Sequence, residues 1–204
     1  RFMLFLSGTV RRQGRVDHGD AFLDTDQMEK ERGITIFSKE ARLSWNKTDI
    51  TLVDTPGHTD FAGETERAMD IMDAAVLVIS APDGIQSHTR TIWKLLEKNG
   101  IPVILFANKT DRYTGSREEM ISSLASLSEQ IVDCTEDPAE KIALCDETCL
   151  DLYLREGGIP ESRIRSMTRE RKLFPCFFGA ALRNEGIEPL LDFLAGFAEG
   201  MENR

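Results

Sequence analysis

Three clusters of polar or small residues each follow an apolar run of this chain. They are Asp-Thr-Pro-Gly-His at 54–58, Asn-Lys-Thr-Asp at 108–111 and Gly-Ala-Ala-Leu at 179–182. The carboxylate of Asp54 could hold a Mg²⁺ ion, and the glycine of the Pro56-Gly57 turn could bring a backbone N–H to a terminal phosphate. His58 would then be placed to orient a water molecule. The alternative is an ordinary turn with His58 on the surface.

The second cluster, at 108–111, has the groups that distinguish guanine from adenine. The Asp111 carboxylate can accept hydrogen bonds from the N1–H and 2-amino groups of guanine, whereas adenine offers no such pair of donors. A site that leaves a buried polar group unpaired can reject the wrong ligand by roughly 10⁴–10⁵. The Lys109 stem could lie over the base, and Asn108 could join neighbouring loops. The alternative is a loop of ordinary polar residues after a strand.

The same four residues also occur at 46–49, where their surroundings differ. This segment lies between two short runs, 41–45 and 50–53, that read as strands, and Asn and Asp are common turn formers. We therefore predict a hairpin turn for the first copy. The second copy follows a continuous apolar run, and its position makes it the candidate base reader, that is, the segment that would recognise the guanine base.

Two further segments give weaker signals. The loop FFGAALRNEGI at 177–187 could present backbone N–H groups to the guanine O6, or it could be a plain loop. In RGITI at 32–36, the hydroxyl of Thr35 could coordinate Mg²⁺ and close its loop over a γ-phosphate. Alternatively, RGITI is a piece of strand in which Ile34 and Ile36 face the same side.

The strands that must position these clusters are those of an α/β protein with a mostly parallel sheet flanked by helices. Continuous apolar runs rich in β-branched residues predict buried parallel strands at 74–80 and 102–108. A further buried strand is predicted at 173–180. In such sheets, ligands bind at the carboxyl ends of the strands, where the three clusters occur.

The remaining segments read as helices and loops. A helix is predicted before Gly100, and an amphipathic closing helix at 187–200. Residues 113–172 read as a polar helical insertion and residues 7–40 as a long loop. The opening RFMLFL could be the end of a helix or a short strand.

Composition restricts the class of protein. The chain has 204 residues, 41% hydrophobic and 29% charged, with a net charge of −10, which is typical of a globular domain and argues against generic nucleic-acid or membrane-surface binding. No apolar run approaches the ~20 residues of a membrane span, and no sequence-specific DNA binding is expected.

The four cysteines form no C-x-x-C pair, so we expect reduced thiols in the cytoplasm and no zinc site. A basic cluster could touch an RNA or an acidic protein, or be a solvated helix face; it comprises Arg163, Arg165, Arg169, Arg171 and Lys172.

Together these motifs resemble the GTPase domain of the elongation factor G class of translational GTPases. RGITI, DTPGH, the second NKTD and the GAAL loop occur in that family's order and approximate spacing. The stretch VDHGDAFLDTDQMEKERGITI is most similar to the first switch loop of the tetracycline-resistance ribosomal protection proteins. The resemblance covers the whole chain, 1–204, as one GTPase domain with a P-loop NTPase-like fold. It implies hydrolysis of GTP to GDP and phosphate, a need for Mg²⁺, a ribosomal partner, and a helical insertion at 113–172.

The resemblance also assigns roles to residues. It implies His58 as the catalytic histidine that positions the attacking water, Gly57 as the γ-phosphate sensor, and Thr35 and Asp54 as Mg²⁺ ligands. Ala181 would contact the guanine O6 through its N–H. The implied GTP-binding residues are Asp54, Thr55, Pro56, Gly57, His58, Asn108, Lys109, Thr110, Asp111, Ala180, Ala181 and Leu182.

Two departures from the family pattern limit these expectations. Ala180 stands where the family usually has Ser, and no G-x-x-x-x-G-K-[ST] phosphate loop occurs anywhere in the chain. Because that loop carries most β/γ-phosphate binding in P-loop NTPases, we expect this chain to be a fragment that binds GTP weakly and leaves residues 7–38 mobile. The alternatives are a GTPase-like scaffold that works without nucleotide, and a GTPase switch that acts away from the ribosome.

Overall fold

The computed structural model describes residues 2–9, 39–55, 62–135 and 138–198. Four of the expected site residues, Thr35, Pro56, Gly57 and His58, therefore lie outside the described residues, as does most of the loop expected at 7–40. The chain divides into two compact units, residues 1–72 with 190–204 and residues 73–189. Each unit is described below by itself.

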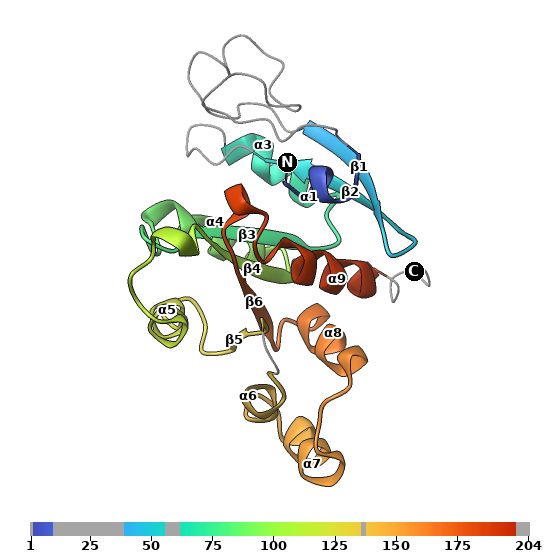
Figure 1. Ribbon diagram of the computed structural model, residues 1–204, viewed down its shortest axis with the longest axis vertical. Helices are drawn as coiled ribbons and strands as arrows, with labels where there is room; N and C mark the ends of the chain where they lie inside the picture. The colour runs from blue at the N-terminus through green and yellow to red at the C-terminus, as the bar shows by residue number, and fades with distance from the viewer. Residues whose placement is uncertain (1, 10–38, 56–61, 136–137, 199–204) are drawn as a thin grey trace. The chain divides into compact units, whose positions relative to one another are not determined.

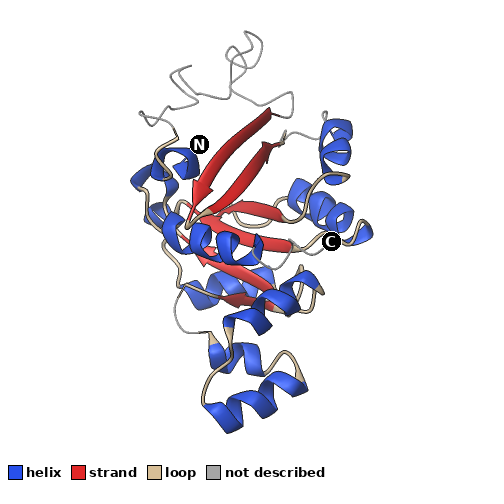
Figure 2. Cartoon of the chain, turned by 90° about the vertical axis from the view of Figure 1, so that its right-hand side faces the viewer, coloured by secondary structure: helices blue, strands red, loops and turns tan. Residues whose placement is uncertain are grey.

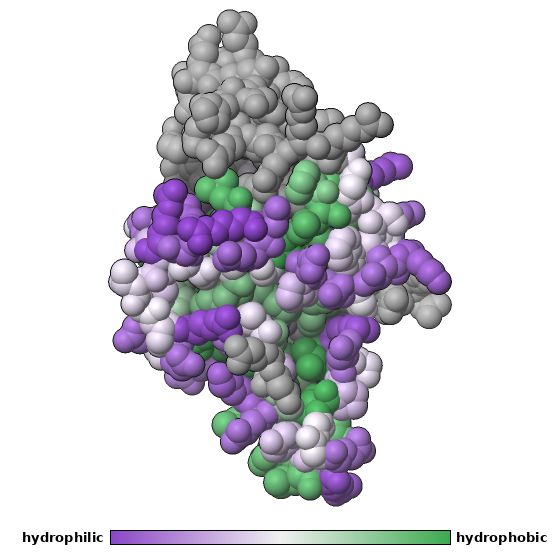
Figure 3. Space-filling view, in the orientation of Figure 1, coloured by the Kyte–Doolittle hydropathy of each residue, from purple (hydrophilic) through white to green (hydrophobic). Residues whose placement is uncertain are grey.

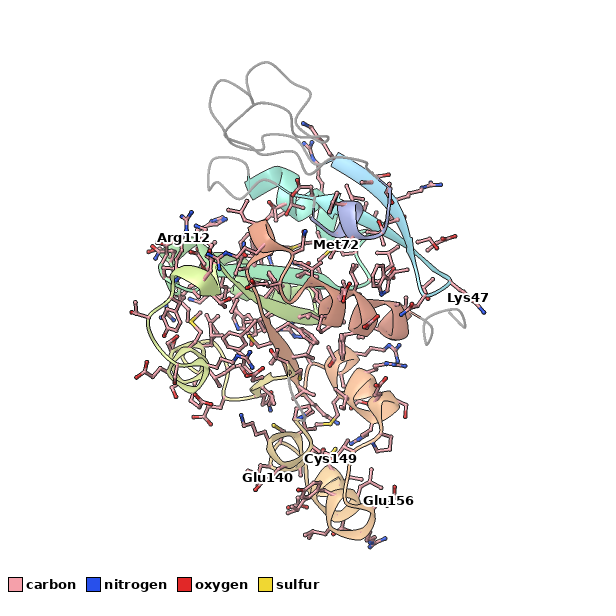
Figure 4. All side chains as sticks on the ribbon, viewed as in Figure 1. Lys47, Met72, Arg112, Glu140, Cys149 and Glu156 are labelled. Atoms are coloured by element: carbon pink, nitrogen blue, oxygen red, sulfur yellow. The ribbon has the colours of Figure 1, made fainter. Side chains whose placement is uncertain are left out.

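The first unit contains the expected hairpin. Strand β1, Lys39–Trp45, pairs antiparallel with β2, Thr48–Asp54, in a register that places Trp45 opposite Thr48. The turn is therefore only two residues long, shorter than expected, because Thr48 and Asp49 already belong to the second strand. Asn46 and Lys47 have φ values of 49° and 68°, the left-handed pair that two-residue hairpin turns require. The first NKTD copy is thus a hairpin turn, as predicted, and Lys47 lies at its tip (Figure 4).

The hairpin is amphipathic, and a helix covers part of it. On β1, Ala41 and Leu43 are buried while Glu40, Arg42 and Ser44 are exposed, as the two-residue period of a strand dictates. Helix α1, Phe2–Leu6, packs against β1 and buries Leu4, so this part of the opening segment is a helix rather than a strand. Helix α3, Ala62–Met69, follows the described end of β2.

The second unit is built on a parallel sheet of four strands in the order β3-β4-β6-β5 (Figure 1). Strands β3, Ala75–Ser80, β4, Val103–Asn108, and β6, Phe174–Phe178, lie where the apolar runs predict them. Every residue of β6, and all of β4 except Asn108, is buried, which explains why both read as continuous apolar runs.

The helices of the second unit complete the α/β pattern (Figure 2). Helix α4, Ser87–Lys98, lies against the sheet through Trp93, whose ring meets that of Phe174 edge-on at 4.9 Å. The chain after α4 turns at Gly100, with φ +66°, as expected for a helix stop. Helix α9, Ile187–Ala198, closes the described chain and begins in this unit.

The insertion at 113–172 is mainly helical but contains a strand. Its helices are α5, Arg117–Leu124, α6, Ala139–Ala143, α7, Glu147–Glu156, and α8, Glu161–Arg169. The prediction of an all-helical segment was incomplete, because β5, Ile131–Asp133, extends the sheet at its edge. A three-residue strand carries too little periodicity to be recognised in the sequence, and its pairing with β6 is what makes it a strand.

A small hydrophobic core holds the insertion together. Cys149 of α7 packs there with Ile142 of α6 and Met167 of α8 (Figure 4). Hydrophobic residues also gather on the surface around α6 and α7 (Figure 3), where Leu144 and Leu154 are 77% and 73% exposed.

The basic residues at the end of the insertion have partners within the protein. Arg163 pairs with Asp146 at 3.1 Å, and the same Asp146 oxygen caps α7 by accepting from the Cys149 N–H. Arg165 and Lys172 pair with nearby glutamates. Arg171 donates to the Ile101 carbonyl and lies over the rings of Trp93 and Phe174. These contacts favour a structural role for the cluster over a nucleic-acid surface.

The four cysteines are free thiols. Burial, reinforced by the neighbouring Asp133, raises the pKa of Cys134 to about 12, so this thiol stays protonated at neutral pH. Within the described ranges, no helix is both long and apolar enough to cross a membrane.

Candidate functional site

Three loops of the second unit leave the carboxyl edge of the parallel sheet side by side. They follow β3, β4 and β6, and hydrogen bonds join each to the next. The Ala81 N–H donates to the Asn108 carbonyl at 2.8 Å, and the Thr110 N–H donates to the Gly179 carbonyl at 3.2 Å. The second NKTD copy lies in the central loop and the GAAL segment in the loop beside it, at the edge where ligands bind in such sheets.

Asn108 joins the two loops through its side chain. Its Oδ1 accepts from the backbone N–H of Lys109 at 2.8 Å and from that of Ala181 at 3.0 Å. Since one oxygen takes both N–H groups, the NH₂ end of the amide is the part of Asn108 that can donate to a ligand acceptor, such as a purine N7. The Ala181 N–H, expected to meet the guanine O6, is held by Asn108 in this structure.

Lys109 adopts an unusual backbone conformation and reaches toward the β3 loop. Its φ and ψ are 62° and 35°, in the left-handed region. The Nζ atom lies 3.6 Å from Oδ2 of Asp83, with both side chains well exposed. The Ser80 hydroxyl, and after it the Lys109 ammonium, hold the pKa of Asp83 below its ordinary value. The Lys109 side chain thus links the β4 loop to the β3 loop.

Asp111 lies on a short 3-10 turn, η3, Thr110–Arg112, and is paired across the site. Its Oδ2 lies 3.4 Å from Nε of Arg183, which belongs to a second such turn, η4, Ala181–Arg183. The Asp111 side chain is 15% exposed and that of Arg183 is 61% exposed. Asp111 as a whole residue is exposed, so most of its exposure comes from its backbone. The Asp111 carboxylate is thus mostly buried and lies beside the Arg183 guanidinium at the rim of the loops.

The loop after β6 closes on itself. Ala180 and Glu185 exchange both backbone hydrogen bonds, at 3.1 Å and 3.2 Å, while Ala180 and Ala181 are buried and Leu182 is exposed. The closure leaves no room for side chains at either glycine of the loop. A Cβ atom would lie 2.2 Å from the Glu185 carbonyl oxygen at Gly179, and 2.1 Å from the Phe178 carbonyl oxygen at Gly186.

Replacing Gly186 by alanine is expected to destabilise this loop. The backbone there has φ +75°, and a Cβ atom would overlap the backbone of β6. An L-residue in the left-handed region costs roughly 1–2 kcal/mol, and displacing backbone adds to that, so the free energy of unfolding should fall by about 3 kcal/mol. Urea-induced unfolding of G186A measures this loss.

Gly100 provides the matched control for this experiment. Its φ is +66°, but a Cβ atom there would meet open space. G100A should therefore lose only the contribution of the backbone conformation, about 1 kcal/mol. Equal losses in the two variants would contradict a steric requirement at Gly186.

The expected Mg²⁺ and phosphate residues are described only in part. Asp54 is the last residue of β2 and Thr55 follows it, both partly buried. Asp54 belongs to the first unit, whereas the second NKTD copy belongs to the second unit. The geometry given above is therefore that of the base-reading loops alone.

Sequence reasoning missed two residues of this part, Asp83 and Arg183. Asp83 follows the buried strand β3 by three residues, so the argument that selected Asp54 could have selected it too. Arg183 follows the GAAL segment directly, but nothing in the sequence indicates that its guanidinium meets Asp111.

Comparisons with known proteins show the family of the chain. The model of the elongation factor Tu GTP binding domain matches residues 2–199. Tetracycline resistance protein TetP of Clostridium perfringens is 33% identical, over 96% of this chain and 34% of the relative. Elongation factor G of Petrotoga mobilis is 30% identical, over 93% of this chain and 35% of the relative. The mitochondrial ribosome-releasing factor 2 of Danio rerio is also 30% identical, over 99% of this chain and 35% of the relative.

The chain spans about a third of the length of these curated relatives. A crystal structure of a protein from Thermus thermophilus has a TM-score of 0.84 at 22% identity, covering 95% of this chain and 37% of that one. This likeness confirms the expected P-loop NTPase-like α/β fold. With the family match over nearly all of its length, the chain belongs to the elongation factor Tu GTP-binding domain family, the GTP-binding domain of translational GTPases.

Proposed function

We propose that this chain binds guanine nucleotide and forms the GTP-hydrolysing part of a ribosome-associated translation factor that acts in the cytoplasm. The observation that carries the proposal is the joining of the NKTD loop to the GAAL loop by Asn108, with the carboxylate of Asp111 at the rim. The family match adds that related domains bind GTP.

Guanine recognition would use three side chains of the NKTD loop. The Asp111 carboxylate accepts from the N1–H and 2-amino groups, the Asn108 amide donates to N7, and the Lys109 stem lies over the base. Adenine would leave the carboxylate without the two donors of the base, and a mostly buried acceptor that loses its donors disfavours the wrong base. The Ala181 N–H can serve O6 only if it shares or exchanges its bond to Asn108.

Hydrolysis would depend on residues of the first unit. Thr35 and Asp54 supply the hydroxyl and carboxylate oxygens that Mg²⁺ prefers, and a Mg²⁺ bound there would neutralise charge on the phosphates. Gly57 would leave space for a backbone N–H to meet the γ-phosphate, and His58 would orient the attacking water. Because the chain contains no G-x-x-x-x-G-K-[ST], we further propose that these 204 residues bind nucleotide weakly by themselves.

The test compares GTP and ATP hydrolysis by the native gene product, with and without ribosomes. The proposal expects GTP-specific turnover that ribosomes stimulate, and millimolar rather than micromolar GDP binding by the 204-residue chain alone. Equal use of ATP would exclude guanine specificity, and GTP turnover that ribosomes leave unchanged would favour a switch acting elsewhere. A native protein that ignores both nucleotides would instead indicate a GTPase-like scaffold.

A further inference from the structure

We infer that Arg183 is a positioning residue that orients the Asp111 carboxylate and so sets discrimination at the 2-amino group of guanine. The inference rests on the proposed function, since it concerns the same base-reading site. Its basis is the ion pair between the two 3-10 turns, in which Arg183 Nε lies 3.4 Å from Asp111 Oδ2.

The two partners differ in how far they are exposed to solvent. The Asp111 side chain is 15% exposed, whereas 61% of the Arg183 side chain faces solvent. A carboxylate on a short turn can rotate about its side-chain bonds, and only one rotation presents its two oxygens to two parallel N–H donors. An anchored guanidinium that approaches one oxygen selects among these rotations, because its planar N–H groups have fixed directions.

The backbone that carries Arg183 is held by hydrogen bonds. Arg183 ends a turn in which its own N–H donates to the Ala180 carbonyl at 2.8 Å, inside the loop that Ala180 and Glu185 close. Asn108 fixes the start of this turn through the Ala181 N–H at 3.0 Å. The segment Gly179–Ala181 offers no polar side chain, and the Arg183 guanidinium meets Asp111 from this loop.

Positioning has a signature that simple charge attraction lacks. Inosine diphosphate keeps N1–H and O6 but has no 2-amino group, so its base can donate only one of the two hydrogen bonds to the carboxylate. If Arg183 aligns both oxygens, its loss weakens GDP more than inosine diphosphate. If Arg183 only raises the local positive charge, its loss weakens both nucleotides equally.

The experiment measures GDP and inosine diphosphate affinities of the native gene product by competition against a fluorescent GDP analogue. For R183A we expect GDP affinity to fall by about threefold to fivefold, the scale of a partly exposed ion pair, with inosine diphosphate changed by less than about twofold. R183K should fall between R183A and the unsubstituted protein, because lysine keeps the charge but not the planar fork. R112A is the matched control, since Arg112 lies at the surface beside Asp111 on the same turn (Figure 4) and should leave the ratio unchanged.

The outcomes separate this inference from the proposed function. Equal loss for both nucleotides, no change, or tighter GDP binding by R183A would each overturn the positioning role while leaving guanine binding intact. Failure of the unsubstituted protein to bind GDP would instead overturn the proposed function. Thermal unfolding of R183A alongside R112A shows whether the loop stays folded, and a common loss of stability with both nucleotides weakened would also contradict the inference.

Discussion

Replacing Asp111 by asparagine is expected to change the base preference of the protein from guanine to xanthine. The asparagine NH₂ would face the 2-amino group of guanine, donor against donor, whereas xanthine carries an acceptor oxygen at that position. We expect GDP affinity to fall by at least about a hundredfold, because a bound charge-assisted pair is replaced by an unpaired polar contact. Xanthosine diphosphate should bind D111N better than it binds the unsubstituted protein, and competition with a fluorescent nucleotide measures both affinities.

The chain contains its own control for this experiment. Asp49 is the last residue of the first NKTD copy and belongs to strand β2, opposite Ser44. D49N makes the same chemical change in the same tetrapeptide, but at a hairpin, and should leave nucleotide preference unchanged. A D111N protein that still prefers GDP, or a D49N protein that loses it, would show that the second copy is not the base reader.

Replacing His58 by alanine is expected to abolish most ribosome-stimulated GTP hydrolysis while leaving GDP affinity within about twofold. An imidazole that orients or accepts a proton from the attacking water typically contributes about 10²- to 10⁴-fold, and alanine offers no nitrogen for this task. Single-turnover hydrolysis on ribosomes measures the loss, and nucleotide competition confirms that binding survives.

His88 supplies the matched control for His58. It lies on α4 of the second unit and is partly exposed, so H88A removes an imidazole and leaves the sequence of residues 54–58 unchanged. H88A should hydrolyse GTP at the normal rate. Normal turnover in H58A would refute the role of His58, and loss of GDP binding in H58A would indicate a role in binding instead.

Much of the fold follows from local patterns. Runs such as VILFAN favour buried parallel strands, because they alternate with helices and carry no charge on either face. The hairpin follows from alternation on both sides of Asn46-Lys47, and the stop of α4 from Gly100. The insertion at 113–172 was predicted as helical, yet β5 was missed because three residues gain strand structure only by pairing with β6.

The two NKTD copies could be told apart from sequence, because the difference between a hairpin and the end of a buried strand depends on the residues immediately beside each copy. The contacts that join the base-reading loops could not be predicted from the sequence in the same way. Asn108 meets Ala181 across 73 positions of sequence, and Arg183 meets Asp111 over a similar distance. Such contacts depend on the order of strands in the sheet, because β4 and β6 are neighbours in space although a whole insertion separates them along the chain. The same holds for the basic cluster, whose partners became apparent only once α7, α8 and the sheet were in place.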